Sequence, residues 1–293
     1  MSRPKHTALG FSLIEMIVVC AILVIVMGAV FTTIDQVAQR SQAEQVKTDL
    51  TQSGREFVDE FQRDLHQAGY PNCRMIATPG APSNCPPDYT NVLVAKNSAV
   101  AVGLVSVSNT QVVFEGDVDG DGVVDSVWYR LVDQNNNYPP TTTCPCTLQR
   151  SQMPKDATNS TLPLLQPTTF SQELQNVVNS GVVVGTAPYG TGLGIAGSTA
   201  WGASNTAYYA AITTFKDFPV FTAYDQNGDP VALPLDLSTA AGQANIPSIK
   251  SVRLTINLLA NAVTGVDTKT RVRPVETLVG SARLVNCGGQ PCD

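Results

Sequence analysis

Charged residues are scarce in this 293-residue chain, at 14% of the composition. An average soluble domain has roughly 25%. Basic residues are also outnumbered, with 18 Lys and Arg against 24 Asp and Glu, so that the formal net charge is −6. This balance argues against a chain held to nucleic acid by its overall charge. We therefore predict no direct nucleic-acid partner.

Residues suited to catalysis are few as well. The only two histidines are His6 and His66, whereas catalytic and metal sites normally combine several His with Cys or carboxylates. The sequence contains no G-x-S-x-G motif, no P-loop and no paired metal-ligand motif. It also lacks a repeat of solenoid length. An enzyme is therefore the least favoured class.

Turn-forming residues, in contrast, are common. The chain has 22 Gly and 19 Pro, together with many Ser, Thr, Asn and Gln. This composition predicts a loop-rich and β-rich protein with a polar but weakly charged surface. The length suits one large domain or two small ones.

A long apolar run follows a short basic leader. Residues 1–10 carry Arg3 and Lys5 and end at Gly10, and residues 11–31 are almost wholly apolar. At 1.5 Å per residue, this run can cross a hydrocarbon core of ~30 Å. A secretory signal would be shorter, with small residues after the apolar core. We therefore expect a retained span, with the leader cytoplasmic and the rest of the chain outside.

One carboxylate, Glu15, interrupts the apolar run. A lone acid in a membrane span is costly and marks function by default, although near the end of a span it can also reach the lipid headgroups. The order of features, GFSLIE at residues 10–15 before an unbroken apolar helix, resembles the class III signal GFxLxE of type IV pilins and pseudopilins. The resemblance implies that prepilin peptidase cuts between Gly10 and Phe11 and methylates the new amine of Phe11. It also implies that Glu15 is an assembly carboxylate, which pairs with the amine of a neighbouring subunit.

The helical pattern continues beyond the span. Apolar residues step by four or seven, as expected for one face of a helix, and charged residues, Asp64 among them, occupy the other positions. The apolar face comprises Val46, Leu50, Phe57, Phe61 and Leu65. No Pro interrupts residues 11–69, and Gly69 followed by Pro71 is a good stop. The sequence predicts one helix from Ser12 to about Gln67.

The remainder of the chain reads as β-structure. Strands are expected at residues 92–94, 99–107, 111–115, 123–131, 219–224, 231–235, 251–259 and 278–285. The last two of these alternate apolar and polar residues as a half-buried strand does. Two polar segments, 134–165 and 185–207, are too long for plain turns and are expected to be functional or partly ordered loops. A short helix is expected around residues 171–178. A long helix followed by antiparallel strands gives an α+β fold.

Three further segments resemble one family. The helix ending FQRDLHQAGY (61–70), the strand NIPSIKSVRLTI (245–256) and the final LVN (284–286) resemble PilW-type minor pilins. The resemblance implies a type IV pilin-like fold, with a leader at 1–10, a transmembrane and filament-core helix at 11–34, its amphipathic half at 35–70, and a β-rich head at 71–293. It implies a precursor in the bacterial inner membrane, with its head in the periplasm, that later reaches the pilus and cell surface.

The same resemblance implies a function in pilus assembly. Partners would be prepilin peptidase, other minor pilins, the major pilin, the inner-membrane assembly platform and membrane lipid. The chain would initiate or join a type IV pilus that supports twitching motility, adhesion and DNA uptake. Two alternatives stay open at this point: a minor pseudopilin of a type II secretion system, and a pilus-tip adhesin or binding module.

An acidic segment is the one candidate metal site. Asp117, Asp119, Asp121 and Asp125 supply oxygens at positions 1, 3, 5 and 9 of a calcium loop, with Gly122 at position 6. Position 12 is Trp128 where a bidentate Glu belongs, and the flanks are strands, so this is no EF-hand. A tight Asp/Gly hairpin is the plain interpretation, and bound Ca²⁺ is the alternative, because it would relieve repulsion between four carboxylates.

The seven cysteines fall into two groups by their position, one within the apolar span and six outside it. Cys20 lies within the span and is most simply a small apolar residue. The other six lie outside the membrane, an even number in an oxidising compartment: Cys73, Cys85, Cys144, Cys146, Cys287 and Cys292. We expect the disulfides Cys73–Cys85 and Cys287–Cys292, because each would close a short loop. A Cys144–Cys146 bridge would be strained, but any other pairing would break those two.

Overall fold

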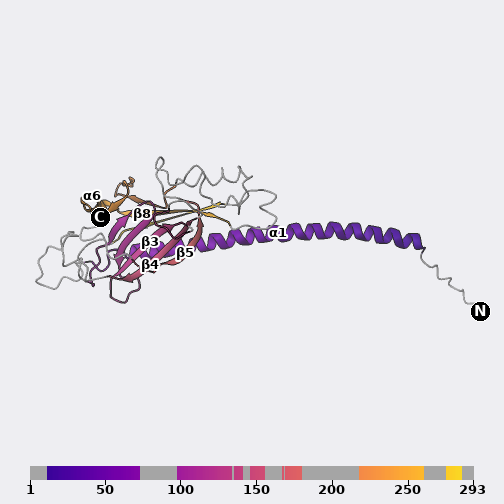
Figure 1. The fold of residues 1–293 in the computed structure, drawn as a ribbon, viewed down its shortest axis with the longest axis horizontal. Helices are drawn as coiled ribbons and strands as arrows, with labels where there is room; N and C mark the ends of the chain where they lie inside the picture. The colour runs from indigo at the N-terminus through magenta and orange to yellow at the C-terminus, as the bar shows by residue number, and fades with distance from the viewer. Residues whose placement is uncertain are drawn as a thin grey trace, which may run out of the picture.

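The computed structural model describes residues 12–72, 98–133, 135–140, 146–155, 167, 169–179, 218–260 and 275–285. One long helix, α1 (Leu13–His66), projects from a β-rich head, and only its C-terminal part lies against that head (Figure 1). Its 54 residues correspond to a length of about 80 Å. The α+β arrangement expected from the sequence is confirmed.

The docked part of α1 has the apolar face that the sequence predicts. Phe57, Phe61 and Leu65 are buried, and Val46 and Leu50 are half-buried further along the same face. Asp64 corrects the prediction, because it is buried at 2% exposure rather than lying on the solvent side. A buried carboxylate needs partners, and those of Asp64 are described with the site below.

The helix ends where the sequence predicts. Gln67 is the C-terminal cap, and Gly69 follows with a φ of 80°, a left-handed conformation that glycine adopts without steric cost. The N–H of Gly69 donates to the carbonyl oxygen of Glu115 at 2.8 Å. The chain therefore leaves the helix directly onto the sheet.

Nine strands of the described chain form one antiparallel sheet. The order is β6-β8-β5-β4-β3-β2-β1-β7, and β9 pairs with the other side of β8. The strands are β1 (Leu104–Val107), β2 (Gln111–Gly116), β3 (Asp125–Val132), β4 (Cys146–Pro154), β5 (Ser171–Val177), β6 (Phe221–Tyr224), β7 (Leu235–Asp236), β8 (Ser251–Leu259) and β9 (Val275–Arg283). A short helix α6 (Ala240–Asn245) and a 3-10 turn η1 (Ile246–Ser248) precede β8.

Most predicted strands are present. The strand β8 has the predicted bounds, and β2, β3, β6 and β9 lie within three residues of theirs. The expected strand at 99–107 is shortened to β1, and that at 231–235 is reduced to the two-residue β7. The predicted strand at 92–94 and the loop at 185–207 lie outside the described residues.

Two predictions for the middle of the head are wrong. The expected loop at 134–165 contains the nine-residue strand β4, and the expected helix at 171–178 is the strand β5. The cause in β5 is visible in its register, which shifts against β4 between Cys146 and Gln149. Asn176 has a φ of 61°, as expected of the extra residue in a β-bulge. Leu174 and Val177 consequently point inward at a spacing of three, which imitates a helix.

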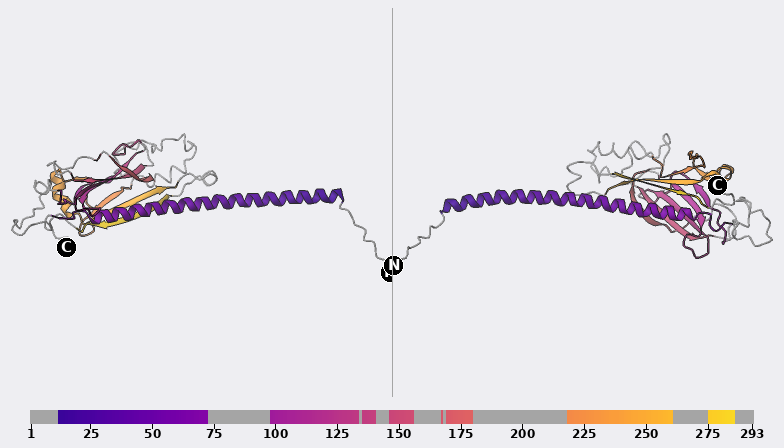
Figure 2. Two further views of the ribbon diagram at one scale, coloured as in Figure 1. Left: turned by 90° about the horizontal axis from the view of Figure 1, so that it is seen from below. Right: turned by 180° about the vertical axis from the view of Figure 1, so that it is seen from behind.

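The core lies between α1 and the concave side of the sheet (Figure 2). Tyr129 is fully buried, with ring centroids 5.3 Å from Phe61 and 6.4 Å from Phe114. Fully burying each such ring stabilises the fold by about 1.5–3 kcal/mol. The helix approaches β9 closely at Gly280, where an added Cβ would lie only 2.5 Å from the Val58 side chain of α1.

Candidate functional site

The N-terminal half of α1 exposes an apolar surface. Every residue from Ser12 to Ala38 is exposed. Ile25 and Val37, for example, are 72% and 61% exposed. An 18-residue window of this helix has a mean hydropathy of 2.9, and α1 is the one helix in the described chain long and apolar enough to cross a membrane. Such a surface needs lipid or other apolar helices as its environment.

Glu15 lies in the first turn of this apolar half and is exposed. The predicted cleavage site at Gly10 and Phe11 lies outside the described residues. Ser12 caps the helix by position, without a side-chain hydrogen bond. The carboxylate therefore stands at the start of the exposed surface, one turn along from the predicted new N-terminus.

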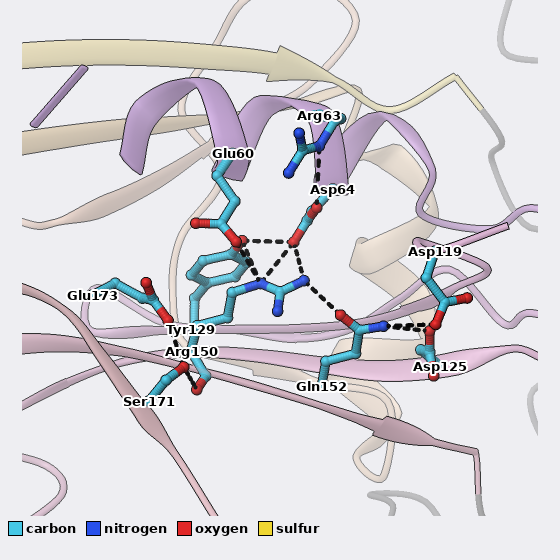
Figure 3. A network of polar contacts seen from close by, with 10 residues as sticks. All are labelled: Glu60, Arg63, Asp64, Asp119, Asp125, Tyr129, Arg150, Gln152, Ser171 and Glu173. Atoms are coloured by element: carbon cyan, nitrogen blue, oxygen red, sulfur yellow. Dashed lines mark hydrogen bonds and ion pairs between the residues drawn. The ribbon is translucent and has the colours of Figure 1, made fainter. Parts of the chain in front are cut away.

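The other half of α1 is fixed to the head by an ionic network (Figure 3). Arg150 of β4 donates from Nη2 and Nε to Oδ2 of Asp64 at 2.7 and 2.9 Å, and the hydroxyl of Tyr129 donates to the same oxygen at 2.7 Å. Glu60 lies 3.3 Å from Nε of Arg150. Burial raises the pKa of Glu60, and the charge of Arg150 opposes that rise. Charge-assisted bonds of this kind are about twice as strong as neutral ones.

The network continues from the helix to the acidic segment through Gln152. Its Oε1 accepts from Nη2 of Arg150 at 2.9 Å, and its Nε2 donates to Oδ2 of Asp125 at 2.8 Å and to Oδ2 of Asp119 at 3.3 Å. Figure 3 shows these residues in one line from α1 to the acidic loop. A single amide thus connects the helix-docking ion pair with the carboxylates.

The acidic segment is the hairpin between β2 and β3, as its plain interpretation predicts. Gly120 and Gly122 adopt left-handed φ values of 79° and 86°, and both donate their backbone N–H groups to Asp117, at 2.8 and 3.2 Å. The backbone N–H groups of Asp121 and Val123 bond to carboxylates of the loop in the same way. These bonds account for the loop's shape.

Three of the four predicted calcium ligands come together. Carboxylate oxygens of Asp117, Asp119 and Asp121 lie within 4.8 Å of one another, and Asp125 is outside this group. Burial, opposed by the hydrogen bond from Gln152 and aided by the three other carboxylates, raises the pKa of Asp125 to about 6. Carboxylate oxygens are the donors that Ca²⁺ prefers, so the donor chemistry fits, and calcium binding stays a prediction.

Comparison with known proteins locates a motif at the N-terminus. Residues 5–31 match the family model described as the prokaryotic N-terminal methylation motif. The match supports a type IV pilin-like protein. This motif is a prepilin-type signal and marks a structural family, not an enzymatic one. No curated protein and no solved structure matches the chain.

The prepilin-type signal explains why half of the helix is apolar and exposed. It implies processing by prepilin peptidase and partners within a pilus-type system. Together with the apolar helix it indicates membrane anchoring. The predicted cleavage and assembly residues Gly10, Phe11 and Glu15 lie within the matched segment.

The cysteine predictions are tested only slightly. Cys20 is free and exposed on the apolar half of α1. Cys146 is disulfide-bonded, and its partner lies outside the described residues, as do Cys73, Cys85, Cys144, Cys287 and Cys292. The pairing of the six cysteines stays a prediction.

Sequence reasoning missed Arg150 and Tyr129. They lie 86 and 65 residues from Asp64 along the chain, and no local pattern relates them. The one available signal was Asp64 itself, which is flanked by Leu65 and Phe61 on the apolar face. A carboxylate on such a face predicts a cationic partner in the head.

Proposed function

We propose that the chain is a minor type IV pilin of the PilW type, which takes part in initiating pilus assembly or is incorporated into the pilus. One observation carries this proposal. A single helix has an exposed apolar half that starts with Glu15, directly within a prepilin-type signal, and a second half that is fixed to a folded head.

The two halves suggest a sequence of events. The precursor sits in the inner membrane with its head in the periplasm, and prepilin peptidase cuts after Gly10 and methylates Phe11. On extraction, the apolar half exchanges lipid for the helices of other minor pilins and the major pilin, aided by the assembly platform. A buried carboxylate is stable only beside a cation, and the methylated amine of a neighbour's Phe11 would supply that cation to Glu15.

In this proposal the head selects neighbours and contributes no catalytic step. Motility, adhesion and DNA uptake then follow from the filament, which carries the protein to the cell surface. The six cysteines of the head would pair in the periplasm. Calcium at the acidic hairpin would stabilise the head without taking part in chemistry.

The mass of the mature protein tests the pathway. We expect protein purified from bacterial membranes to begin at Phe11 and to carry one added methyl group. In cells without prepilin peptidase it should begin at Met1. An N-terminus at Met1 in cells with active peptidase would contradict the proposal.

Assembly tests the role. Deletion of the chain, or the substitution Glu15→Ala, should abolish surface pili, whereas the control Glu44→Ala, on the exposed side of the same helix, should not. Pili that remain normal while type II secretion fails would indicate a pseudopilin instead. Pili that remain normal while attachment fails would indicate a tip adhesin.

A further inference from the structure

Two outer strands of the sheet, β7 and β9, are protected to different degrees. At one edge, β7 has only two residues, and α6 packs so closely on it that a Cβ at Gly242 would collide with the backbone of Asp236. At another edge, β9 runs for nine residues. Natural proteins usually shorten, charge, bulge or cover a sheet edge, because its free backbone groups bind other strands.

The register of β9 shows which backbone groups face outward. Leu284 donates its N–H to Lys250 at 2.8 Å, and the β8–β9 register is unbroken from there. Because bonded and non-bonded pairs alternate in antiparallel strands, Leu278 and Gly280 bond to β8, whereas Thr277 and Val279 point their N–H and C=O groups away. In the part of the chain that the structure describes, these outward groups have no hydrogen-bond partner.

Among the described residues, only one end of this edge is occupied. Gln62 of α1 donates from Nε2 to the carbonyl oxygen of Ser281 at 3.0 Å, which leaves residues 275–279 open. The side chains of Thr277 and Val279 are exposed, Val279 at 48%. The one charged side chain in this stretch, Glu276, is bound to Lys47 of α1 at 2.8 Å. The open edge therefore carries no free charge, proline or bulge.

We propose that the open edge of β9 binds an extended strand of a different protein, aligned antiparallel to residues 275–279. Main-chain bonds to Thr277 and Val279 would provide affinity, as in other cases of strand addition. Because the exposed neighbours are Thr277 and Val279, the incoming strand would be uncharged at its central positions, free of proline, and β-branched or apolar where it flanks them.

Orientation excludes a second copy of this chain as the antiparallel partner. Successive contacts run in the same direction along α1 and β9, from Lys47–Glu276 to Val58–Gly280 and Gln62–Ser281. Two β9 strands paired antiparallel would therefore point their α1 helices in opposite directions. This step rests on the proposed function, in which all such helices enter one membrane from the same side.

Hydrogen exchange of single amides tests the proposal on the full-length protein. In the isolated protein in detergent, the amides of Thr277 and Val279 should exchange at least about 10-fold faster than those of Leu278 and Gly280. In inner membranes that contain the assembled pilus machinery, they should slow by at least about 10-fold. Slow exchange in the isolated monomer, protection that appears only as the isolated protein is concentrated, or fast exchange in both samples would overturn it.

A variant pair confirms which groups are used. Val279→Pro removes one outward N–H and no bond to β8, and should abolish the protection of Thr277, whereas Val279→Thr should preserve it. Urea unfolding reports whether Val279→Pro disturbs folding. If it does, Thr277→Lys takes its place as the test variant and should likewise abolish the protection. Protection that survives both Val279→Pro and Thr277→Lys would contradict the proposal. The N-terminal mass of each sample reports the proposed function separately, so the two can fail independently.

Discussion

The two halves of α1 have the same backbone and opposite surroundings. From Leu13 to Val37 the apolar side chains are exposed, whereas from Gly54 to Leu65 one face is buried against the head. A helix satisfies its own backbone hydrogen bonds, so it can continue unchanged from lipid into a folded domain. The comparison teaches that side chains alone divide this helix into an assembly part and an anchoring part.

The largest expected contrast is between two phenylalanines. Phe61→Ala should lower the free energy of unfolding of the head by about 3–5 kcal/mol, because the ring is fully buried. Phe31→Ala should leave it unchanged, because Phe31 is 64% exposed on the other half. Urea unfolding of the full-length protein in detergent measures both. Equal changes in unfolding free energy for the two substitutions would contradict the division of α1 into an assembly part and an anchoring part.

The next contrast concerns two aspartates. Asp64→Ala should cost about 3 kcal/mol, because it leaves Arg150, with 15% side-chain exposure, without its main partner. The control Asp35→Ala, whose residue is exposed, should change the unfolding free energy by less than about 0.5 kcal/mol. The double substitution Asp64→Leu with Arg150→Met should recover much of the loss. A double variant no more stable than Asp64→Ala would show that the charge was not the cause.

Two glycines provide a subtler contrast. An added Cβ at Gly28 meets nothing within 4 Å, whereas at Gly54 it would meet the Leu278 and Leu258 side chains. Alanine favours an isolated helix by about 1 kcal/mol over glycine, so Gly28→Ala should leave the unfolding of the head unchanged and raise the helicity of the free half. Gly54→Ala should destabilise the head by about 1–2 kcal/mol. A neutral or stabilising Gly54→Ala would mean that Leu278 moves aside freely.

The smallest effect is expected at the acidic hairpin, which Gln152 connects to the docked half. The pKa of Asp125 is raised to about 6 in the folded protein, so the fold binds this proton more tightly than the unfolded chain does. Stability from Asp125 is therefore full below about pH 4 and is lost as the pH rises to about 6. With allowance for solvent screening, the loss should be about 1 kcal/mol, and Asp125→Asn should remove it.

Calcium offers a second test of the hairpin. If Ca²⁺ binds Asp117, Asp119 and Asp121, millimolar CaCl₂ at pH 7 should raise the unfolding midpoint by a few degrees, and chelation should reverse the rise. Asp121→Asn should weaken the response, and Asp225→Asn, in an exposed turn elsewhere, should not. An identical unfolding midpoint with and without Ca²⁺ would mean that the acidic segment is a hairpin that does not bind calcium.

The sequence predicts the elements whose packing is periodic and local. Helix α1 and strand β8 emerge with correct bounds because Phe57, Phe61 and Leu65, or Val252, Leu254 and Ile256, repeat with one period. The strand β4 is missed because two of its buried residues, Gln149 and Ser151, are polar and alternate with Leu148 and Arg150, which face α1. Their burial is satisfied by partners from distant segments, such as Asn136 for Gln149, and no local pattern reports that.

The same limit applies to the site. The GFSLIE signal and the Asp-rich hairpin are contiguous, so the sequence predicts them directly. The Asp64–Arg150–Tyr129 network joins three elements, and the open edge of β9 depends on the register with β8. Both are properties of the assembled sheet, which a single sequence does not display.

The alignment of α1 with β9 has a mechanical consequence. A pulling force applied along the helix reaches the head through Lys47–Glu276, Gln62–Ser281 and Asp64–Arg150. Because these contacts are spread along the axis of the helix, a force along that axis loads them in shear and does not peel them apart one after another. A subunit built this way should transmit tension from its neighbours to its head as a single rigid unit.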